Sequence, residues 1–131
     1  GLGTLESLAC ETPIIVTMTG GLQEQVTDGN DNWFGIGIQP SSKAVIGSQD
    51  VPYIYEDRLK KEDFLEAIET IYNMSKEERE KMGKAGRQHV IDNYGMAQYS
   101  GLWYETFKKI TEDFGSWDNR KNYKKWEMFE V

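Results

Sequence analysis

The second half of the chain places apolar and charged residues at helical spacing. Between residues 61 and 73 the apolar positions fall three or four residues apart, with Lys and Glu between them. These apolar residues are Phe64, Leu65, Ile68, Ile71 and Tyr72. The spacing predicts an amphipathic helix over residues 61–73, with its charged face toward solvent.

Two further helices are expected after it. Ser75 and Glu78 have the spacing of a capping box, in which each residue's side chain bonds an otherwise unpaired amide of the first turn. A helix should therefore run over residues 76–93. A third helix is predicted over residues 96–114 by another apolar stripe: Leu102, Trp103, Phe107, Ile110 and Phe114.

The first third of the chain is rich in glycine, threonine and β-branched residues. The run from Ile14 to Met18 is typical of a buried strand in a parallel sheet. A helix around residues 4–9 is expected before this strand, and a short helix over residues 22–26 is expected after it. Residues 33–38 are predicted to form a second strand.

The next stretch offers weaker signals. Residues 40–50 have no periodicity, so a polar loop is expected there. Residues 53–55, Tyr-Ile-Tyr, are typical of a third short strand or an extended segment.

Alternating helices and strands predict an α/β fold, in which helices cover the faces of a parallel sheet. Two or three strands are fewer than the roughly six of a complete doubly wound sheet, so we expect only part of such a domain. Residues 1–60 should form the part with the sheet, and residues 61–131 should form a helical C-terminal segment of the same domain.

Composition and charge disfavour several classes of function. Lys and Arg number 15 against 22 Asp and Glu, a net charge of −7, so neither nucleic acid nor an anionic membrane is an expected partner. One cysteine and one histidine cannot form an internal disulfide or a zinc cluster, so no metal is expected. The longest apolar run, Ile14–Val16, is far too short to span a bilayer. These features predict a soluble, cytoplasmic protein.

Two features near the amino end can bind a ligand. Gly1 and Gly3 precede the first predicted helix, where glycines let a ligand approach the backbone and first-turn amides attract anions. Glu6 can accept hydrogen bonds from a vicinal diol. Each feature also has a structural interpretation, an ordinary turn for the glycines and complementation of the helix dipole for Glu6, and this is the commoner one.

A longer pattern surrounds these residues. G-L, then L-E-S-L-A-C-E-T-P-I-I, and then T-G-G-L-Q-E occupy positions between residues 1 and 24. This sequence closely resembles the nucleotide-binding domain of the group 1 family of GT-B glycosyltransferases, with its E-G-x-G-L-x-x-L-E-A-x-A-C-G-T-P-V-V pattern, a strand and G-G-x-x-E. Weaker similarity continues to about residue 110 and includes M-G-K-A-G-R at residues 82–87. The resemblance implies a partial Rossmann-like sheet, the C-terminal half of a donor-binding domain.

The resemblance also implies roles for individual residues. Glu6 matches the second glutamate of the E-x7-E pair and would bind the ribose hydroxyls of the donor, while the first glutamate would fall just before Gly1. Gly20 and Gly21 match a loop on the rim of the site, although a tight turn explains them equally well. A loop whose amides meet the diphosphate and the sugar is matched by Gly1, Leu2, Gly3 and Thr4.

Other features are interpreted structurally. No acidic partner or nucleophile is placed near His89 by pattern, so no catalytic role is expected for it. Cys10 is interpreted as a packing residue. The loop from residue 40 to residue 52 is longer than in relatives and either shapes acceptor choice or is solvated surface. An aromatic tail suits packing on another domain better than base stacking: Trp117, Tyr123, Trp126 and Phe129.

The leading functional hypothesis is a glycosyltransferase that moves a hexose from a nucleoside diphosphate sugar to a carbohydrate or other hydroxyl acceptor. The resemblance implies retention of configuration and no metal or other cofactor, and it assigns no catalytic residue here. Relatives carry basic side chains and an acceptor domain upstream, so this chain alone is expected to be inactive without that N-terminal part. The alternative is a non-enzymatic binding or assembly module derived from such a domain.

Overall fold

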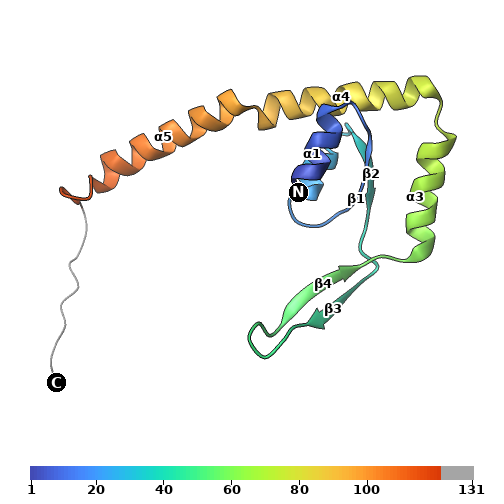
Figure 1. Cartoon of the computed structure of the whole chain (residues 1–131), viewed down its shortest axis with the longest axis horizontal. Coiled ribbons are helices and arrows are strands. Elements are labelled where there is room, and N and C mark those ends of the chain that lie inside the picture. Colours follow the sequence, from blue (N-terminus) through green and yellow to red (C-terminus); the bar gives the residue numbers. More distant parts are fainter. Residues whose placement is uncertain (122–131) are drawn as a thin grey trace. The chain divides into compact units, whose positions relative to one another are not determined.

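The computed structural model describes residues 1–121 and divides into two compact units, Gly1–Asn93 and Tyr94–Val131. Each unit is described by itself (Figure 1). The aromatic residues Tyr123, Trp126 and Phe129 lie outside the described residues. None of the described helices is long and apolar enough to cross a bilayer.

The first unit opens with α1 (Leu2–Ala9), β1 (Ile14–Thr17), α2 (Leu22–Val26) and β2 (Gly35–Ile38). β1 and β2 are parallel, with partners running from Ile14↔Gly35 to Thr17↔Ile38. Alternate residues of β1 point into a small core of five buried side chains: Leu8, Ile14, Val16, Val26 and Phe34. The mixed α/β class with a small parallel sheet is therefore confirmed.

The loop expected over residues 40–50 is wrong, because this segment belongs to an antiparallel hairpin. β3 (Ser42–Ile46) pairs with β4 (Ile54–Arg58), and Val45 lies opposite Tyr55. The residues of β3 are exposed except for a half-buried Ala44, so β3 lacks the alternation of buried and exposed positions that identifies a strand in a sequence. The hairpin is held by backbone pairing instead of burial. The extended segment expected at residues 53–55 forms the start of β4, which continues to Arg58.

The three long helices agree with their sequence predictions: α3 (Lys61–Asn73), α4 (Lys76–Tyr94) and α5 (Met96–Phe114). The capping box at the start of α4 is confirmed. The backbone N–H of Ser75 donates to Glu78 Oε2 at 2.7 Å, and the N–H of Glu78 donates to Ser75 Oγ at 3.2 Å. α5 ends at Gly115, whose φ of +77° suits a residue without a side chain.

α4 approaches the carboxyl end of α1 through two glycines. A side chain at Gly83 would overlap the carbonyl oxygen of Glu11, and a Cβ at Gly86 would lie 2.7 Å from Leu8 Cδ2. Next to Gly86, Arg87 Nη1 donates to the carbonyl oxygen of Ala9 at 2.7 Å. This bond occupies one of the carbonyls that the last turn of a helix leaves unpaired. The M-G-K-A-G-R segment therefore has a structural role in joining α4 to α1.

We predict that Gly83→Ala destabilises the first unit, because the added methyl meets a backbone atom that cannot rotate away. The free energy of unfolding should fall by about 1–3 kcal/mol, because the cost of the steric overlap exceeds the usual gain in helix propensity when alanine replaces glycine. Urea unfolding followed by circular dichroism measures it. Lys84→Ala, one residue along the exposed side of α4, is the control and should change stability by less than about 0.5 kcal/mol. Equal stability of the two variants would contradict this packing.

The capping box predicts a specific pH dependence. Hydrogen bonds from the backbone and side chain of Ser75 hold the pKa of Glu78 below its ordinary value of 4.5. The charged carboxylate therefore stabilises the fold fully above that ordinary value, and this contribution is lost as the pH falls through the lower pKa of the folded state.

Glu78→Gln should accordingly lower the melting temperature at about pH 6, and the difference from wild type should shrink by about pH 3. Glu80→Gln is the matched control, because Glu80 only pairs with Lys76 across 3.7 Å on the helix surface. A difference between wild type and Glu78→Gln that stays constant over this range would show that the carboxylate does not act as a charged cap.

Candidate functional site

The carboxyl ends of β1 and β2 form one edge of the sheet. The backbone N–H of Met18 donates to the carbonyl oxygen of Ile38 at 2.9 Å, so the chain leaves both strands side by side. A short connection joins the carboxyl end of α1 to β1 at the opposite edge of the sheet. The amino end of α1 therefore lies at the edge formed by the carboxyl ends of the strands, beside the loop between β1 and α2 (Figure 1). Ligands of open α/β sheets bind at this edge.

The first turn of α1 faces open space. A side chain added at Gly1 or Gly3 would meet no atom within 4 Å, and no side chain caps the helix start among the described residues. The Thr4 hydroxyl lies 2.7 Å from the carbonyl oxygen of Gly1 and also contacts the side-chain oxygen of Gln25 on α2. First-turn backbone amides of this kind are the groups that bind anions at helix starts.

The loop expected over Gly1–Thr4 is corrected by the structure. α1 begins at Leu2, so Leu2, Gly3 and Thr4 form its first turn and Gly1 is the N-cap. The first residue of a helix is difficult to predict from sequence, especially where glycines precede or enter the first turn. The amides of these residues consequently have the fixed direction of a helix end instead of that of a flexible loop.

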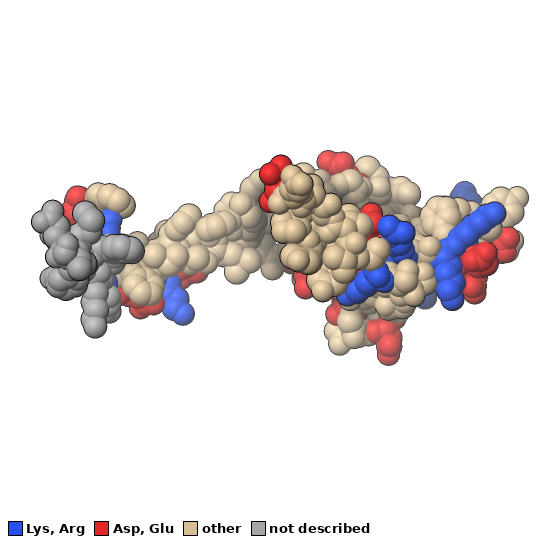
Figure 2. Space-filling view, turned by 90° about the horizontal axis from the view of Figure 1, so that it is seen from below, with Lys and Arg blue, Asp and Glu red and all other residues tan. Residues whose placement is uncertain are grey.

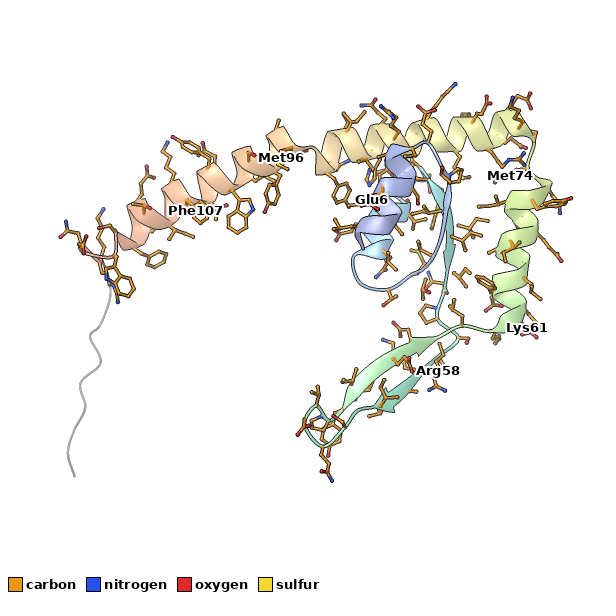
Figure 3. The ribbon with its side chains drawn as sticks, viewed as in Figure 1. Glu6, Arg58, Lys61, Met74, Met96 and Phe107 are labelled. Atoms are coloured by element: carbon orange, nitrogen blue, oxygen red, sulfur yellow. The ribbon has the colours of Figure 1, made fainter. Side chains whose placement is uncertain are left out.

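Glu6 is exposed on the second turn of α1 (Figure 3). Its carboxylate makes no hydrogen bond or ion pair with the part of the chain that the structure describes. Glu6 is not buried against apolar side chains, so its carboxylate can accept hydrogen bonds from a ligand. Contact of that carboxylate with a donor's ribose stays a prediction.

Gly20 and Gly21 form the turn between β1 and α2. Gly20 has a φ of +50°, and Gly21 is the N-cap of α2. Neither glycine position has a neighbouring atom where a Cβ would lie. The tight turn accounts for Gly20, because few residues other than glycine adopt a positive φ. The rim role stays a prediction, although the turn does lie at the same sheet edge as the amino end of α1.

The segment that contains both strands is acidic. No Lys or Arg occurs in residues 1–42, whereas this segment holds five acidic residues: Glu6, Glu11, Glu24, Asp28 and Asp31. Hydrogen bonds from the Asn32 side chain and the Asn30 backbone hold the pKa of Asp28 below its ordinary value, so it is charged at neutral pH. Arg87 reaches α1 only at its carboxyl end. Helix amides are thus the groups that this segment can offer to a phosphate.

His89 makes contacts that hold the fold together. Its Nε2 lies 2.8 Å from the carbonyl oxygen of Glu24, its Nδ1 lies 3.0 Å from Asn93 Nδ2, and its ring stacks on Phe34 at 4.4 Å. These contacts tie α4 to α2. No group of three metal-ligating side chains occurs within residues 1–121.

The structure corrects the expectation for Cys10 and shows a role for Gln25 that the sequence did not predict. Cys10 is exposed at the C-cap of α1, so its interpretation as a packing residue is wrong. Gln25 is buried and contacts Thr4, which ties α2 to the first turn of α1. The sequence contains no usable signal for the burial of Gln25, because the five-residue helix α2 is too short to show a periodicity of buried positions.

A groove of about 390 Å³ lies between β2 and α3. Its lining includes Gln39, Asp63, Glu66 and Thr70, and it contains none of the residues that the sequence predicted for the donor site. Acidic side chains at this groove disfavour a diphosphate there. The candidate site therefore stays at the amino end of α1.

Comparison with known proteins gives one informative similarity. The chain is 26% identical over 109 residues to a D-inositol 3-phosphate glycosyltransferase of Paenarthrobacter aurescens (strain TC1). The aligned residues make up 83% of this chain and 21% of that protein, so the chain spans about a fifth of its curated relative. No protein-family model and no solved structure matches the chain. The chain is thus similar to part of a glycosyltransferase.

Proposed function

We propose that this chain forms part of the donor site in a glycosyltransferase of the GT-B, group 1 type. In this proposal, the amides at the amino end of α1 bind the diphosphate of a nucleoside diphosphate sugar, and Glu6 binds the ribose hydroxyls. Gly20 and Gly21 contribute the rim. The proposal places the remaining cationic side chains and the acceptor domain in other parts of a longer protein.

The observation that carries the proposal is the position of the amino end of α1 at the carboxyl edge of a parallel pair of strands. That end places the backbone amides of Leu2, Gly3 and Thr4 in the first turn of a helix, beside the turn at Gly20 and Gly21. Helix amides at such an edge stabilise negative charge through the helix dipole. The similarity to a glycosyltransferase over most of the chain supports the same assignment.

The chemistry that follows is transfer of a hexose with retention of configuration. An acceptor hydroxyl oxygen bonds to the anomeric carbon, the bond from that carbon to the diphosphate breaks, and the hydroxyl proton leaves with the nucleoside diphosphate. Because the charge of the leaving diphosphate increases during this step, fixed helix amides stabilise the transition state more than the ground state. This arrangement requires no metal.

One observation favours a second candidate, a non-enzymatic assembly module. α5 has no buried residue, and its apolar positions are exposed: Leu102, Trp103, Phe107, Ile110 and Phe114. Exposed apolar surface of this extent is typical of a protein interface. Donor binding distinguishes the two candidates, because an assembly module has no need of a nucleotide sugar.

We predict that Glu6→Gln weakens donor binding in the enzyme that contains this chain. One carboxylate oxygen becomes an amide that cannot accept a hydrogen bond from the ribose diol. The loss of a charged hydrogen bond lowers affinity by roughly 10- to 150-fold, equivalent to about 1.5–3 kcal/mol. Calorimetric titration of UDP and GDP sugars into wild type and variant measures this change.

Glu69→Gln is the matched control, since Glu69 is an exposed glutamate on α3, away from the proposed site. It should bind the donor as wild type does. The melting temperature of Glu6→Gln without ligand should also stay close to that of wild type, because only a few tenths of a kcal/mol of dipole interaction changes. Equal donor affinity of Glu6→Gln and wild type would remove Glu6 from the site.

A further inference from the structure

The groove between β2 and α3 follows the backbone edge of a strand. Four consecutive residues of the chain line its strand side: Ile36, Gly37, Ile38 and Gln39. Successive side chains of a strand point to opposite faces of a sheet, so a groove lined by consecutive residues runs along the edge of the strand. Since β1 occupies one edge of β2, this groove lies at the other edge, where α3 runs alongside the strand (Figure 1).

Backbone groups on this edge of β2 are unpaired. On the side of β1, the backbone N–H of Met18 donates to the carbonyl oxygen of Ile38 at 2.9 Å. Alternate residues of a strand direct their backbone groups to opposite edges, so those of Gly37 and Gln39 point away from β1. Within residues 1–121, no turn, loop or side chain bonds the backbone N–H of either residue. An edge of this kind can pair with a further strand.

The helix side of the groove has matching dimensions. Its residues are three or four positions apart and therefore share one face of α3: Asp63, Glu66, Ala67 and Thr70. These helix residues span about 10 Å, and the strand residues 36–39 also span about 10 Å. Ala67 is buried, and its small side chain brings α3 close to β2 without filling the groove. The groove thus has the length of a short extended peptide.

The charge of the groove is negative. Within the described residues, no Lys or Arg lines it, and the carboxylates of Asp63 and Glu66 make no hydrogen bond or ion pair. On the face seen from below, Lys and Arg side chains are interspersed with Asp and Glu, without a broad field of one sign (Figure 2). The charge preference of the groove therefore comes from its own two carboxylates, which attract a cation.

We propose that the groove binds an extended segment of a partner protein that carries Lys or Arg, added as a strand to the free edge of β2. Backbone hydrogen bonds to Gly37 and Gln39 provide affinity, and cationic side chains beside Asp63 and Glu66 provide specificity. The same carboxylates repel an acidic or phosphorylated segment. None of the proposed donor-site residues lines the groove, so the inference does not depend on the proposed function.

Fluorescence anisotropy with labelled peptides and the protein that contains this chain tests the proposal. The basic probe is fluorescein-Val-Lys-Val-Lys-Val-amide, and the acidic probe has glutamate in place of both lysines. Two further versions of the basic probe carry N-methyl groups, one on its valines and the other on its lysines. Each version lacks the N–H donors of one edge of the extended peptide.

The basic probe should bind, and the acidic probe should bind several-fold more weakly. Only one N-methylated version should lose affinity, because one edge of the bound peptide faces away from β2. The double variant Asp63→Asn, Glu66→Gln should bind the basic probe about two- to thirtyfold more weakly, since two exposed ion pairs are lost. Glu69→Gln is the matched control and should bind as wild type, because Glu69 is exposed on α3 outside the groove.

Hydrogen–deuterium exchange shows whether the edge of β2 is open in the longer protein. The amides of Gly37 and Gln39 should exchange quickly in the free protein and more slowly with the basic probe. Slow exchange before the probe is added would show that another strand of the protein already pairs with β2, which overturns the inference. It is also overturned if the basic probe does not bind, if the acidic probe binds equally well, if both N-methylated versions have the same affinity, or if the double variant binds as wild type.

Discussion

The contact between α4 and the carboxyl end of α1 is the constraint on which the rest of the first unit depends. Glycines at positions 83 and 86 let the backbone of α4 approach Glu11 and Leu8, and Arg87 on the same helix donates a hydrogen bond to the carbonyl oxygen of Ala9. Side chains larger than hydrogen at these glycines would separate the helices. Because α1 is fixed at its carboxyl end, its amino end keeps a defined direction.

This arrangement assigns different tasks to the two ends of the parallel pair of strands. The end where α4 packs carries the stabilising contacts, including the stack of His89 on Phe34 and its bond to α2. The opposite end carries uncapped helix amides, a glycine turn and the base of the hairpin. A ligand can bind at the second end without competing with the packing that holds the fold together.

Elements with a strong local signal could be predicted from the sequence. α3 and α4 followed from helical spacing and from the Ser75–Glu78 box, and β1 followed from a β-branched run before a glycine pair. The strand β3 could not be recognised, because its residues are exposed on both faces and its partner lies several residues further along the chain. Close contacts between distant segments, such as Gly83 with Glu11, have no signature in a single sequence.

In the candidate site, too, some features could be predicted from the sequence and others could not. Gly1, Gly3 and Glu6 were assigned to a site through the resemblance to a glycosyltransferase pattern, and the structure places them in the first two turns of α1 and at its N-cap. The burial of Gln25 against Thr4 was not foreseen, since a five-residue helix has too few positions to define a buried face. Likewise, the exposure of Cys10 depends on the path of the chain after α1.

The central claim is that a nucleotide sugar binds at the amino end of α1. Hydrogen–deuterium exchange of the enzyme, with and without saturating UDP or GDP sugar, tests it most directly because exchange reports on the backbone amides themselves. The account predicts that the donor slows exchange in peptides covering residues 1–9 and 18–22, with no change in a peptide from the middle of α4. Donor binding with unchanged exchange at residues 1–9 would contradict the claim.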